Sequence, residues 1–256
     1  SAGDLSPGLM LGVVLIIAGL GFKIAAVPFH MWAPDAYEGA PIPITAYLAV
    51  GSKAAAIALI LRLFTEAFLP VAGDWQLLLV IMAVATMFVG NLVALVQTNM
   101  KRLLAYSSVG QVGYLVMGIA AIVVVKDGGL ISIELSHLVT NGIMLHLVAY
   151  AITNLAAFLC LAAIYNATGR EDMAGMAGIA RRAPLVGLVM AVSMFSLAGL
   201  PIFAGFASKF YFFNAVAASG MLWLAGLAAV ASLISLYYYL MIVRQMYIET
   251  PEDPTP

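Results

Sequence analysis

The segment FSLAGLPIFAGFASKFYFFN, from Phe195 to Asn214, places Lys209 and a Gly-Leu-Pro sequence at 199–201 inside one of the longest apolar runs of the chain. A lysine at the centre of a membrane helix costs about 2.5–3.5 kcal/mol on insertion scales. Proline removes a helical hydrogen bond, and lipid cannot satisfy the backbone groups that are freed. We therefore predict a broken membrane helix near 199–201, with Lys209 at the centre of a transport path.

The composition is that of an integral membrane protein. Of the 256 residues, 64% are hydrophobic and 9% are charged, whereas soluble domains contain about 25% charged residues. The net charge is −1 and the basic residues are scattered, so no nucleic acid is expected as a partner. The three histidines lie far apart in sequence, and no metal site is predicted. We expect an all-α, polytopic membrane helix bundle.

The apolar runs divide into about seven transmembrane helices, because about 20 residues cross the hydrocarbon core. The predicted spans are Gly8–Phe29, Pro43–Phe68, Trp75–Gln97, Leu103–Val125, one within Leu130–Tyr165, Ala183–Ala218 and Met221–Ile242. The fifth is expected in the later part of its range, since the earlier part carries Glu134 and His137. The sixth is too long for one regular crossing, which fits a break at Gly199–Pro201. Connections are short, so residues 1–256 are expected to form a single membrane domain.

The basic residues of the connections predict the orientation of the chain, because cytoplasmic loops are richer in lysine and arginine. Six of these residues fall on one side of the predicted bundle and two on the other. The first set is Lys101, Arg102, Arg170, Arg181, Arg182 and Arg244, and the second is Arg62 and Lys126. The richer side is expected to be cytoplasmic, with the N-terminus on the outer side of the membrane.

Three other lysines, Lys23, Lys53 and Lys209, lie in apolar surroundings. The ordinary alternative to a buried role is snorkelling, in which the long side chain lifts its ammonium to the interface. Snorkelling fits Lys23 best, because Lys23 lies near the end of its predicted helix. Lys53 is roughly 15 Å inside its span, which is deep for snorkelling. A buried lysine changes its protonation state readily with its surroundings, so these lysines are candidates for a proton relay.

Two predicted helices carry polar residues that could connect the lysines. Ser107, Gln111 and Tyr114 are spaced to share one face of the fourth helix, and His146 and Tyr150 lie on the fifth. Ordinary hydrogen bonding between helices is the alternative for most of them. His146 is added to the relay because imidazole titrates near neutrality.

The sequence contains no cysteine cluster for iron–sulfur, no glycine-rich nucleotide fingerprint and no haem signature. Its single cysteine, Cys160, lies in an apolar run and is expected to be structural. No cofactor-binding residue is therefore predicted, and any electron transfer coupled to this chain is expected in other chains.

Three motifs together resemble the antiporter-like membrane subunits of respiratory complex I. They are PFHMWAPDAYEGAPIP at 28–43, NMKRLLAYSS at 99–108, and SLAGLP at 196–201 followed by Lys209-Phe210-Tyr211. The first is most similar to subunit N, the counterpart of mitochondrial NADH dehydrogenase subunit 2. The resemblance covers essentially the whole chain. It implies the seventh to thirteenth of fourteen family helices, with the N-terminal six and the last absent here.

The resemblance also assigns roles to the lysines. It implies that Lys23, Lys53 and Lys209 occupy the positions of the seventh-, eighth- and twelfth-helix lysines on the family's proton path. The family pairs its seventh-helix lysine with a glutamate on the fifth helix, and this chain has no such helix. At His146 many relatives carry an aromatic residue, so its assignment rests on its chemistry alone.

The leading hypothesis is a proton-translocating membrane subunit of NADH:quinone oxidoreductase, with flavin, iron–sulfur clusters and quinone in partner subunits. Its partners would be other membrane subunits, lipids and protons. The bacterial inner membrane is the expected location, with an organellar energy-converting membrane as the alternative. Two other functions stay open: a Mrp-type cation/proton antiporter or hydrogenase-linked pumping subunit, and a non-pumping structural scaffold of such a complex.

Overall fold

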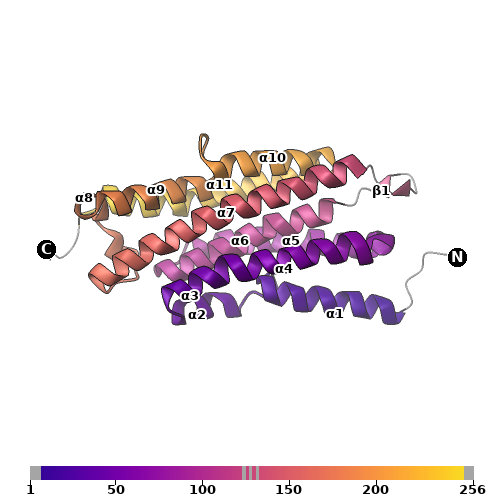
Figure 1. Cartoon of the computed structure of the whole chain (residues 1–256), viewed down its shortest axis with the longest axis horizontal. Coiled ribbons are helices and arrows are strands. Elements are labelled where there is room, and N and C mark those ends of the chain that lie inside the picture. Colours follow the sequence, from indigo (N-terminus) through magenta and orange to yellow (C-terminus); the bar gives the residue numbers. More distant parts are fainter. Residues whose placement is uncertain (1–6, 123–124, 127–128, 131–132, 251–256) are drawn as a thin grey trace.

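The helices run side by side along the long axis of an elongated bundle (Figure 1). This computed structural model describes residues 7–122, 125–126, 129–130 and 133–250. The helices up to the centre of the chain are α1 Pro7–Ile24, α2 Trp32–Gly39, α3 Ile42–Tyr47, α4 Lys53–Arg62, α5 Ala72–Ala94 and α6 Met100–Ala121. Those that follow are α7 Ile133–Thr168, α8 Ile179–Arg182, α9 Pro184–Ala198, α10 Ala204–Ala218 and α11 Leu222–Tyr247. Two short strands, β1 Val125–Lys126 and β2 Gly129–Leu130, pair antiparallel.

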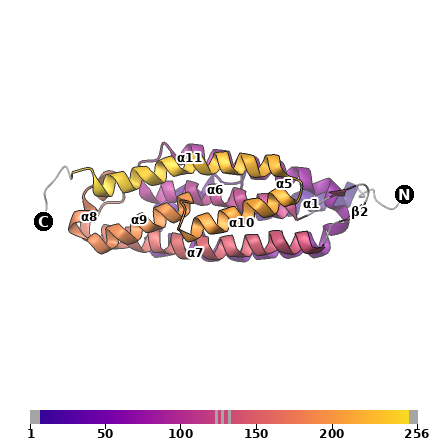
Figure 2. The same ribbon diagram turned by 90° about the horizontal axis from the view of Figure 1, so that it is seen from above.

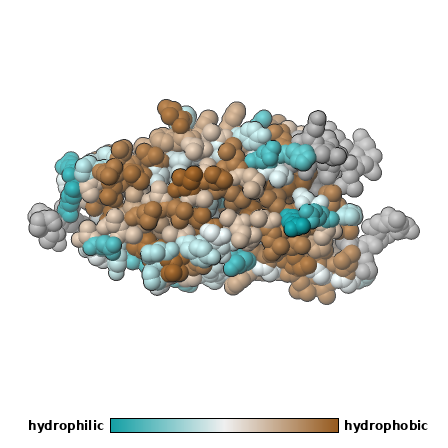
Figure 3. Space-filling view, in the orientation of Figure 1, coloured by the Kyte–Doolittle hydropathy of each residue, from teal (hydrophilic) through white to brown (hydrophobic). Residues whose placement is uncertain are grey.

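Six helical segments of the described chain are long and apolar enough to cross a membrane, and a bent pair formed around α8 and α9 raises the number to as many as seven. The predicted helical membrane bundle of about seven spans is thus confirmed. Apolar side chains cover most of the face seen in Figure 3. Such a surface suits contact with lipid, because there is no water in the bilayer core to solvate polar groups.

The helix α6 forms the centre of the bundle. Every one of its residues except Arg102 is buried, and its most extensive packing is against α5. Asn99 begins the helix by accepting hydrogen bonds from the N–H groups of Lys101 and Arg102. Polar side chains on α6 therefore point into protein on all sides.

The fifth span extends further toward the N-terminus than expected. α7 is a single helix of 36 residues that begins at Ile133, so the part that carries Glu134 and His137 is helical as well. At 1.5 Å per residue the helix is about 54 Å long, which exceeds the hydrocarbon core. Charged residues can therefore occupy the part of the same helix that lies beyond the lipid.

The predicted break in the sixth segment is confirmed. α9 ends at Ala198, and the next residue, Gly199, has the left-handed conformation with φ of 83°. The N–H groups of Gly199 and Leu200 bond back to Ser196 and Phe195. α10 begins five residues later, and both helices lie along α7 (Figure 2). A Cβ atom at Gly205 would lie 1.7 Å from the Ser196 carbonyl oxygen, so only glycine allows this approach of α10 to α9.

The second span is irregular in a way that the sequence did not indicate. Two π-helical segments, η1 Leu48–Ser52 and η2 Leu63–Ala67, flank α4. Single-turn π segments are rare and occur frequently at functional sites. Short 3-10 segments, η3 Leu69–Val71 and η4 Ala174–Met176, complete the described helical elements.

Candidate functional site

Lys53 lies at the meeting point of four helices. It begins α4 directly after η1 and is only 2% exposed. Its Nζ donates a hydrogen bond of 2.7 Å to Ser108 Oγ on α6, and Ser108 Oγ lies 2.7 Å from the Tyr150 hydroxyl on α7. The ammonium also lies 5.8 Å from the centre of the Tyr37 ring on α2. Within the part of the chain that the structure describes, hydroxyl groups and one aromatic ring, not carboxylates, thus surround this lysine.

The π segment before Lys53 contributes to the same group of contacts. A π turn shifts the backbone hydrogen bonds by one residue, and the carbonyl of Ala49 within η1 accepts a hydrogen bond of 3.1 Å from the Tyr150 hydroxyl. Asn154, one turn further along α7, donates its amide to the same hydroxyl at 3.1 Å. Tyr150 is therefore held firmly against Ser108.

The Lys209 side chain contacts the backbone at the break between α9 and α10. It is 5% exposed, and its Nζ donates to the carbonyls of Leu197 at 2.8 Å and Ala198 at 3.4 Å, and to Ser232 Oγ at 3.0 Å. The last carbonyls of a helix have no partner within the helix and form the negative end of its dipole. The carbonyl groups at the end of α9 thus bind the buried Lys209 ammonium, which lies 5.3 Å from the centre of the Tyr114 ring.

His146 lies on the Lys209 side of the site. One ring nitrogen, Nδ1, is 3.2 Å from Ser208 Oγ, and the other, Nε2, is 3.2 Å from the Gln111 side-chain oxygen. Gln111 in turn donates at 3.5 Å to the Leu197 carbonyl that binds Lys209. The imidazole stacks on Phe212 and is 2% exposed. It is therefore fixed by neutral partners on both sides.

A small polar cavity joins the two groups of residues. Its volume is about 10 Å³, close to the minimum that holds one water molecule. The polar side chains around it are Gln111, His146, Tyr150, Thr153, Ser196, Ser208 and Lys209. Tyr150, which contacts Ser108 and through it Lys53, thus lines the same cavity as His146 and Lys209. We call Lys53, Ser108, Tyr150, His146 and Lys209 the polar row, which crosses the middle of the bundle.

The structure brings three of the four predicted relay residues together. Lys53, Lys209 and His146 lie in the polar row, whereas Lys23 is exposed in the last turn of α1. The Lys23 side chain forms no hydrogen bond or ion pair within the described part of the chain. The relay roles themselves stay predictions, and for Lys23 the described contacts add no support.

Sequence reasoning missed the hydroxyl partners of the buried lysines. Ser108 and Ser232 contact Lys53 and Lys209 directly, and Ser208 contacts His146. The only signals available were that Ser208 adjoins Lys209 and that Ser108 adjoins Ser107. The described residues provide no carboxylate within ion-pair distance of Lys53 or Lys209.

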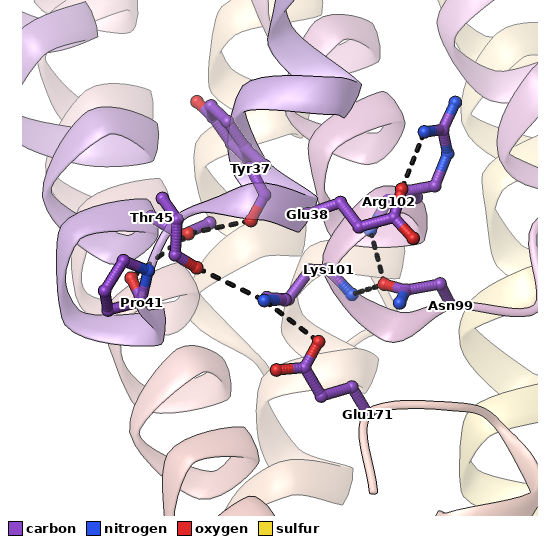
Figure 4. Close-up of polar contacts among 9 residues, drawn as sticks. Tyr37, Glu38, Pro41, Thr45, Asn99, Lys101, Arg102 and Glu171 are labelled. Carbon is purple, nitrogen blue, oxygen red and sulfur yellow. Dashed lines mark hydrogen bonds and ion pairs between the residues drawn. The ribbon is translucent and has the colours of Figure 1, made fainter.

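A second polar cluster lies at one end of the bundle (Figure 4). Arg102 binds Asp35 and Glu38 of α2, each at 2.7 Å. Lys101 binds Glu171 at 2.9 Å and the Ala40 carbonyl at 3.2 Å. We call these residues the charged end. The contacts fasten α2 and the segment after α7 to the start of α6.

Further basic residues lie near the charged end. The Arg170 guanidinium binds Asp172 and holds the pKa of that carboxyl below its usual range. Asp172 pairs through its backbone with Asn99, and the Gly178 N–H, just before α8, bonds to Gln245 of α11. The predicted grouping of basic residues on one side thus agrees with these contacts.

Two solved structures contain chains with a similar fold. A chain of respiratory complex I from Thermus thermophilus with bound Aureothin matches all of this chain and 54% of its own length, with a TM-score of 0.77 and 33% identity. A chain of the Mrp complex from Dietzia sp. DQ12-45-1b matches 98% of this chain and 44% of its own, with a TM-score of 0.85 and 27% identity.

Sequence relatives agree with these likenesses. NADH-quinone oxidoreductase subunit N of Moorella thermoacetica is 44% identical over 97% of this chain and 49% of the relative. Subunit N of Heliobacterium modesticaldum is 46% identical over 98% of this chain and 51% of the relative. The chain thus spans about half the length of these relatives. The family described as NADH:quinone oxidoreductase/Mrp antiporter, TM, matches residues 1–235, and the chain belongs to this family.

Proposed function

We propose that the chain acts in a proton-translocating membrane subunit of NADH:quinone oxidoreductase, and that the polar row between Lys53 and Lys209 carries protons within the membrane. The observation that supports this best is the continuity of the row. Hydrogen bonds lead from Lys53 through Ser108 to Tyr150, and one cavity then borders Tyr150, His146 and Lys209.

The groups in the row are suited to passing protons. Serine and tyrosine hydroxyls both donate and accept hydrogen bonds, and neutral imidazole donates at one nitrogen and accepts at the other. A proton can therefore enter such a group on one side while another leaves on the opposite side. A lysine at each end can store the proton as an ammonium and release it as the surroundings change.

Redox chemistry is expected in partner subunits. A single cysteine cannot ligate an iron–sulfur cluster, and the similar chains come from multi-subunit complexes. We assign flavin, iron–sulfur clusters and quinone to those partners, and place the protein in a bacterial inner membrane with the charged end in the cytoplasm. A Mrp-type antiporter is the related alternative, and the higher identity to subunit N favours the redox-linked function.

The test uses the full-length protein in its assembled complex. We expect Lys53→Ala or Lys209→Ala to lower proton translocation at least about tenfold, because positioned proton-transfer groups contribute about 10²–10⁴-fold. Arg62→Ala is the control, since Arg62 is exposed and Glu66 is its ion-pair partner among the described residues. Assembly is followed by co-purification of the NADH-oxidising subunits, and failure to co-purify them from wild-type membranes would favour the antiporter alternative.

Normal translocation in both alanine variants would contradict the proposal. A structural scaffold makes a different prediction, because its buried lysines would be replaceable by methionine of similar length without loss of activity. The double variant Lys53→Met with Lys209→Met therefore separates the two functions: we expect an assembled complex that does not translocate protons.

A further inference from the structure

The Tyr150 hydroxyl has hydrogen-bond partners from three parts of the chain. It lies 2.7 Å from Ser108 Oγ of α6 and 3.1 Å from the Ala49 carbonyl oxygen of η1, and Asn154 of α7 donates its amide to it at 3.1 Å. A phenolic hydroxyl donates one hydrogen bond, and its oxygen accepts through lone pairs. One donor and two lone pairs are therefore all used by these three partners.

The chemistry of the partners fixes the direction of each hydrogen bond. A carbonyl oxygen only accepts and an amide N–H only donates, so Tyr150 gives its proton to Ala49 and accepts from Asn154. The bond between Ser108 and Tyr150 must then use the Ser108 proton. Ser108 offers only a lone pair to Lys53, whose Nζ is accordingly the donor of the remaining bond.

The π segment η1 explains why the Ala49 carbonyl accepts from a side chain. In a regular α-helix the Lys53 N–H would bond to the Ala49 carbonyl, four residues earlier. Here the Lys53 N–H bonds to the Val50 carbonyl instead. The Ala49 carbonyl does not receive that helical bond, and it accepts one from the Tyr150 hydroxyl.

This pattern of bonds closes the polar row at Tyr150. The residue lines the small cavity beside His146 and Lys209, yet its hydroxyl is fully engaged by partners other than the cavity. An amide carbonyl accepts a hydrogen bond but has no proton of its own to pass on. A proton from Lys53 can therefore not reach the cavity while Tyr150 donates to Ala49.

We propose that Tyr150 is a switch in the polar row, and that the charge of Lys53 sets it through Ser108. This inference rests on the proposed function of the row. The Lys53 ammonium only donates, so it directs the Ser108 proton to Tyr150 and the Tyr150 proton to Ala49. A neutral amine has a lone pair that accepts from Ser108, and Ser108 can then accept from Tyr150.

The transfer begins when the Tyr150 hydroxyl turns from Ala49 to a water molecule in the small cavity, which is large enough for one. The Tyr150 proton passes to that water while the Tyr150 oxygen takes the Ser108 proton and Ser108 takes a proton from Lys53. One N–H bond of the ammonium breaks, and one O–H bond forms on the water. Ser108 and Tyr150 are neutral before and after, and both hydroxyls now point toward the neutral Lys53 amine.

The first test follows the C–O stretching band of Tyr150 in the infrared spectrum of the full-length protein, because this band depends on the partner to which a phenol donates. The spectrum of Tyr150→Phe identifies the band by subtraction. Between neutral and alkaline pH we expect a shift that corresponds to a new hydrogen-bond acceptor, not to a phenolate. In Lys53→Met, which has no proton to lose, the band should stay at one position.

A Tyr150 band that stays fixed in the wild type, or that shifts equally in Lys53→Met, would overturn the proposal. The other titratable side chain beside Lys53 is Tyr37 of α2, whose ring centre lies 5.8 Å from Nζ. Tyr37 is retained in Lys53→Met, so a shift caused by its ionisation would persist in that variant.

The second test compares Tyr150→Phe with Tyr165→Phe in the assembled complex. Both changes remove one hydroxyl and keep the ring, and Tyr165 is an exposed tyrosine of the same helix. We expect Tyr150→Phe to lower proton translocation at least about tenfold, as for other positioned proton-transfer groups, and Tyr165→Phe to behave as wild type. Equal translocation by the two variants would overturn the proposal.

Lys53→Ala is measured alongside to separate the switch from the function on which it rests. Normal translocation in Lys53→Ala would refute the proposed function itself. A loss of translocation in Lys53→Ala together with a fixed Tyr150 band in the wild type would refute only the switch.

Discussion

The two buried lysines of the polar row are held by different kinds of contact. Lys209 donates to two backbone carbonyls and one serine, which uses all three of its donors. Lys53 donates to Ser108 alone among the described residues. Lys209 depends on the interrupted backbone between α9 and α10, whereas Lys53 follows a π segment whose backbone is continuous.

These differences suggest separate tasks for the two sites. Carbonyl oxygens accept hydrogen bonds but carry no proton to exchange, so the contacts of Lys209 favour storage of a charge. The Ser108 hydroxyl can donate as well as accept, and Ser108 is the single hydrogen-bond acceptor that the described residues offer to Lys53. We therefore interpret Lys53 as the site where protons exchange and Lys209 as the site where they are held.

The largest effect on stability is expected where α10 approaches the end of α9. Gly205→Ala would place a Cβ atom 1.7 Å from the Ser196 carbonyl oxygen, so α10 must move away from α9 and the contacts of Lys209 must loosen. Overpacking of this kind costs about 1–3 kcal/mol or more. The measurement is the unfolding temperature of the full-length protein in detergent.

Gly12→Ala in α1 is the matched control for Gly205→Ala, because nothing lies within 4 Å of a Cβ atom at Gly12. The control should keep its unfolding temperature or gain slightly, since alanine favours the helix. Equal temperatures for the two variants would show that Lys209 does not depend on the close approach of α10 to α9.

An intermediate effect on stability is expected when the serine that contacts each buried lysine is replaced by alanine. Ser108→Ala leaves Lys53 without its hydrogen-bond acceptor and should cost about 1–3 kcal/mol, the penalty for an unsatisfied buried group. Ser232→Ala leaves both carbonyls on Lys209, and should cost only about 0.5–1.5 kcal/mol. Thermal unfolding of the two variants shows which substitution lowers the stability more. A larger loss of stability for Ser232→Ala would contradict the proposed difference between the two lysine sites.

The smallest effect on stability is expected at the exposed ion pair between Arg170 and Asp172, which lies outside the membrane-spanning helices. Arg170 lowers the pKa of Asp172, so the pair stabilises the protein above the ordinary aspartate pKa and loses this contribution as the pH falls through the lowered value. Both side chains are nearly half exposed, which limits the effect to about 0–1 kcal/mol. The Arg170→Gln variant should lose slightly less stability than the wild type between neutral and acidic pH. An unchanged pH dependence of the unfolding free energy would show that the ion pair does not contribute to stability.

The sequence was most informative where a residue is costly in lipid. The insertion cost of Lys209 and the helix break at Gly199–Pro201 follow from general rules, and the structure confirms the break. The depth of Lys53 likewise separated it from an interfacial lysine. Such features can be recognised in a single sequence because few arrangements compensate for them.

The partners of these residues could not be predicted in the same way. Ser108 and Ser232 are ordinary helix residues, and their roles depend on which faces of α6 and α11 meet the lysines. The π segments depend on how the second span packs, and Leu48–Ser52 carries no proline that would predict an irregular turn.

The π segment η1 has a consequence for changes in chain length. A π turn holds about one residue more than an α turn, and each residue of a regular helix turns the chain by about 100°. Deleting one residue within Leu48–Ser52 would therefore leave an ordinary α turn and keep Lys53 facing Ser108, whereas deleting one residue of a regular α turn would rotate the residues that follow by about 100°. In a scan of single-residue deletions along the second span, the loss of proton translocation should therefore be smallest within Leu48–Ser52.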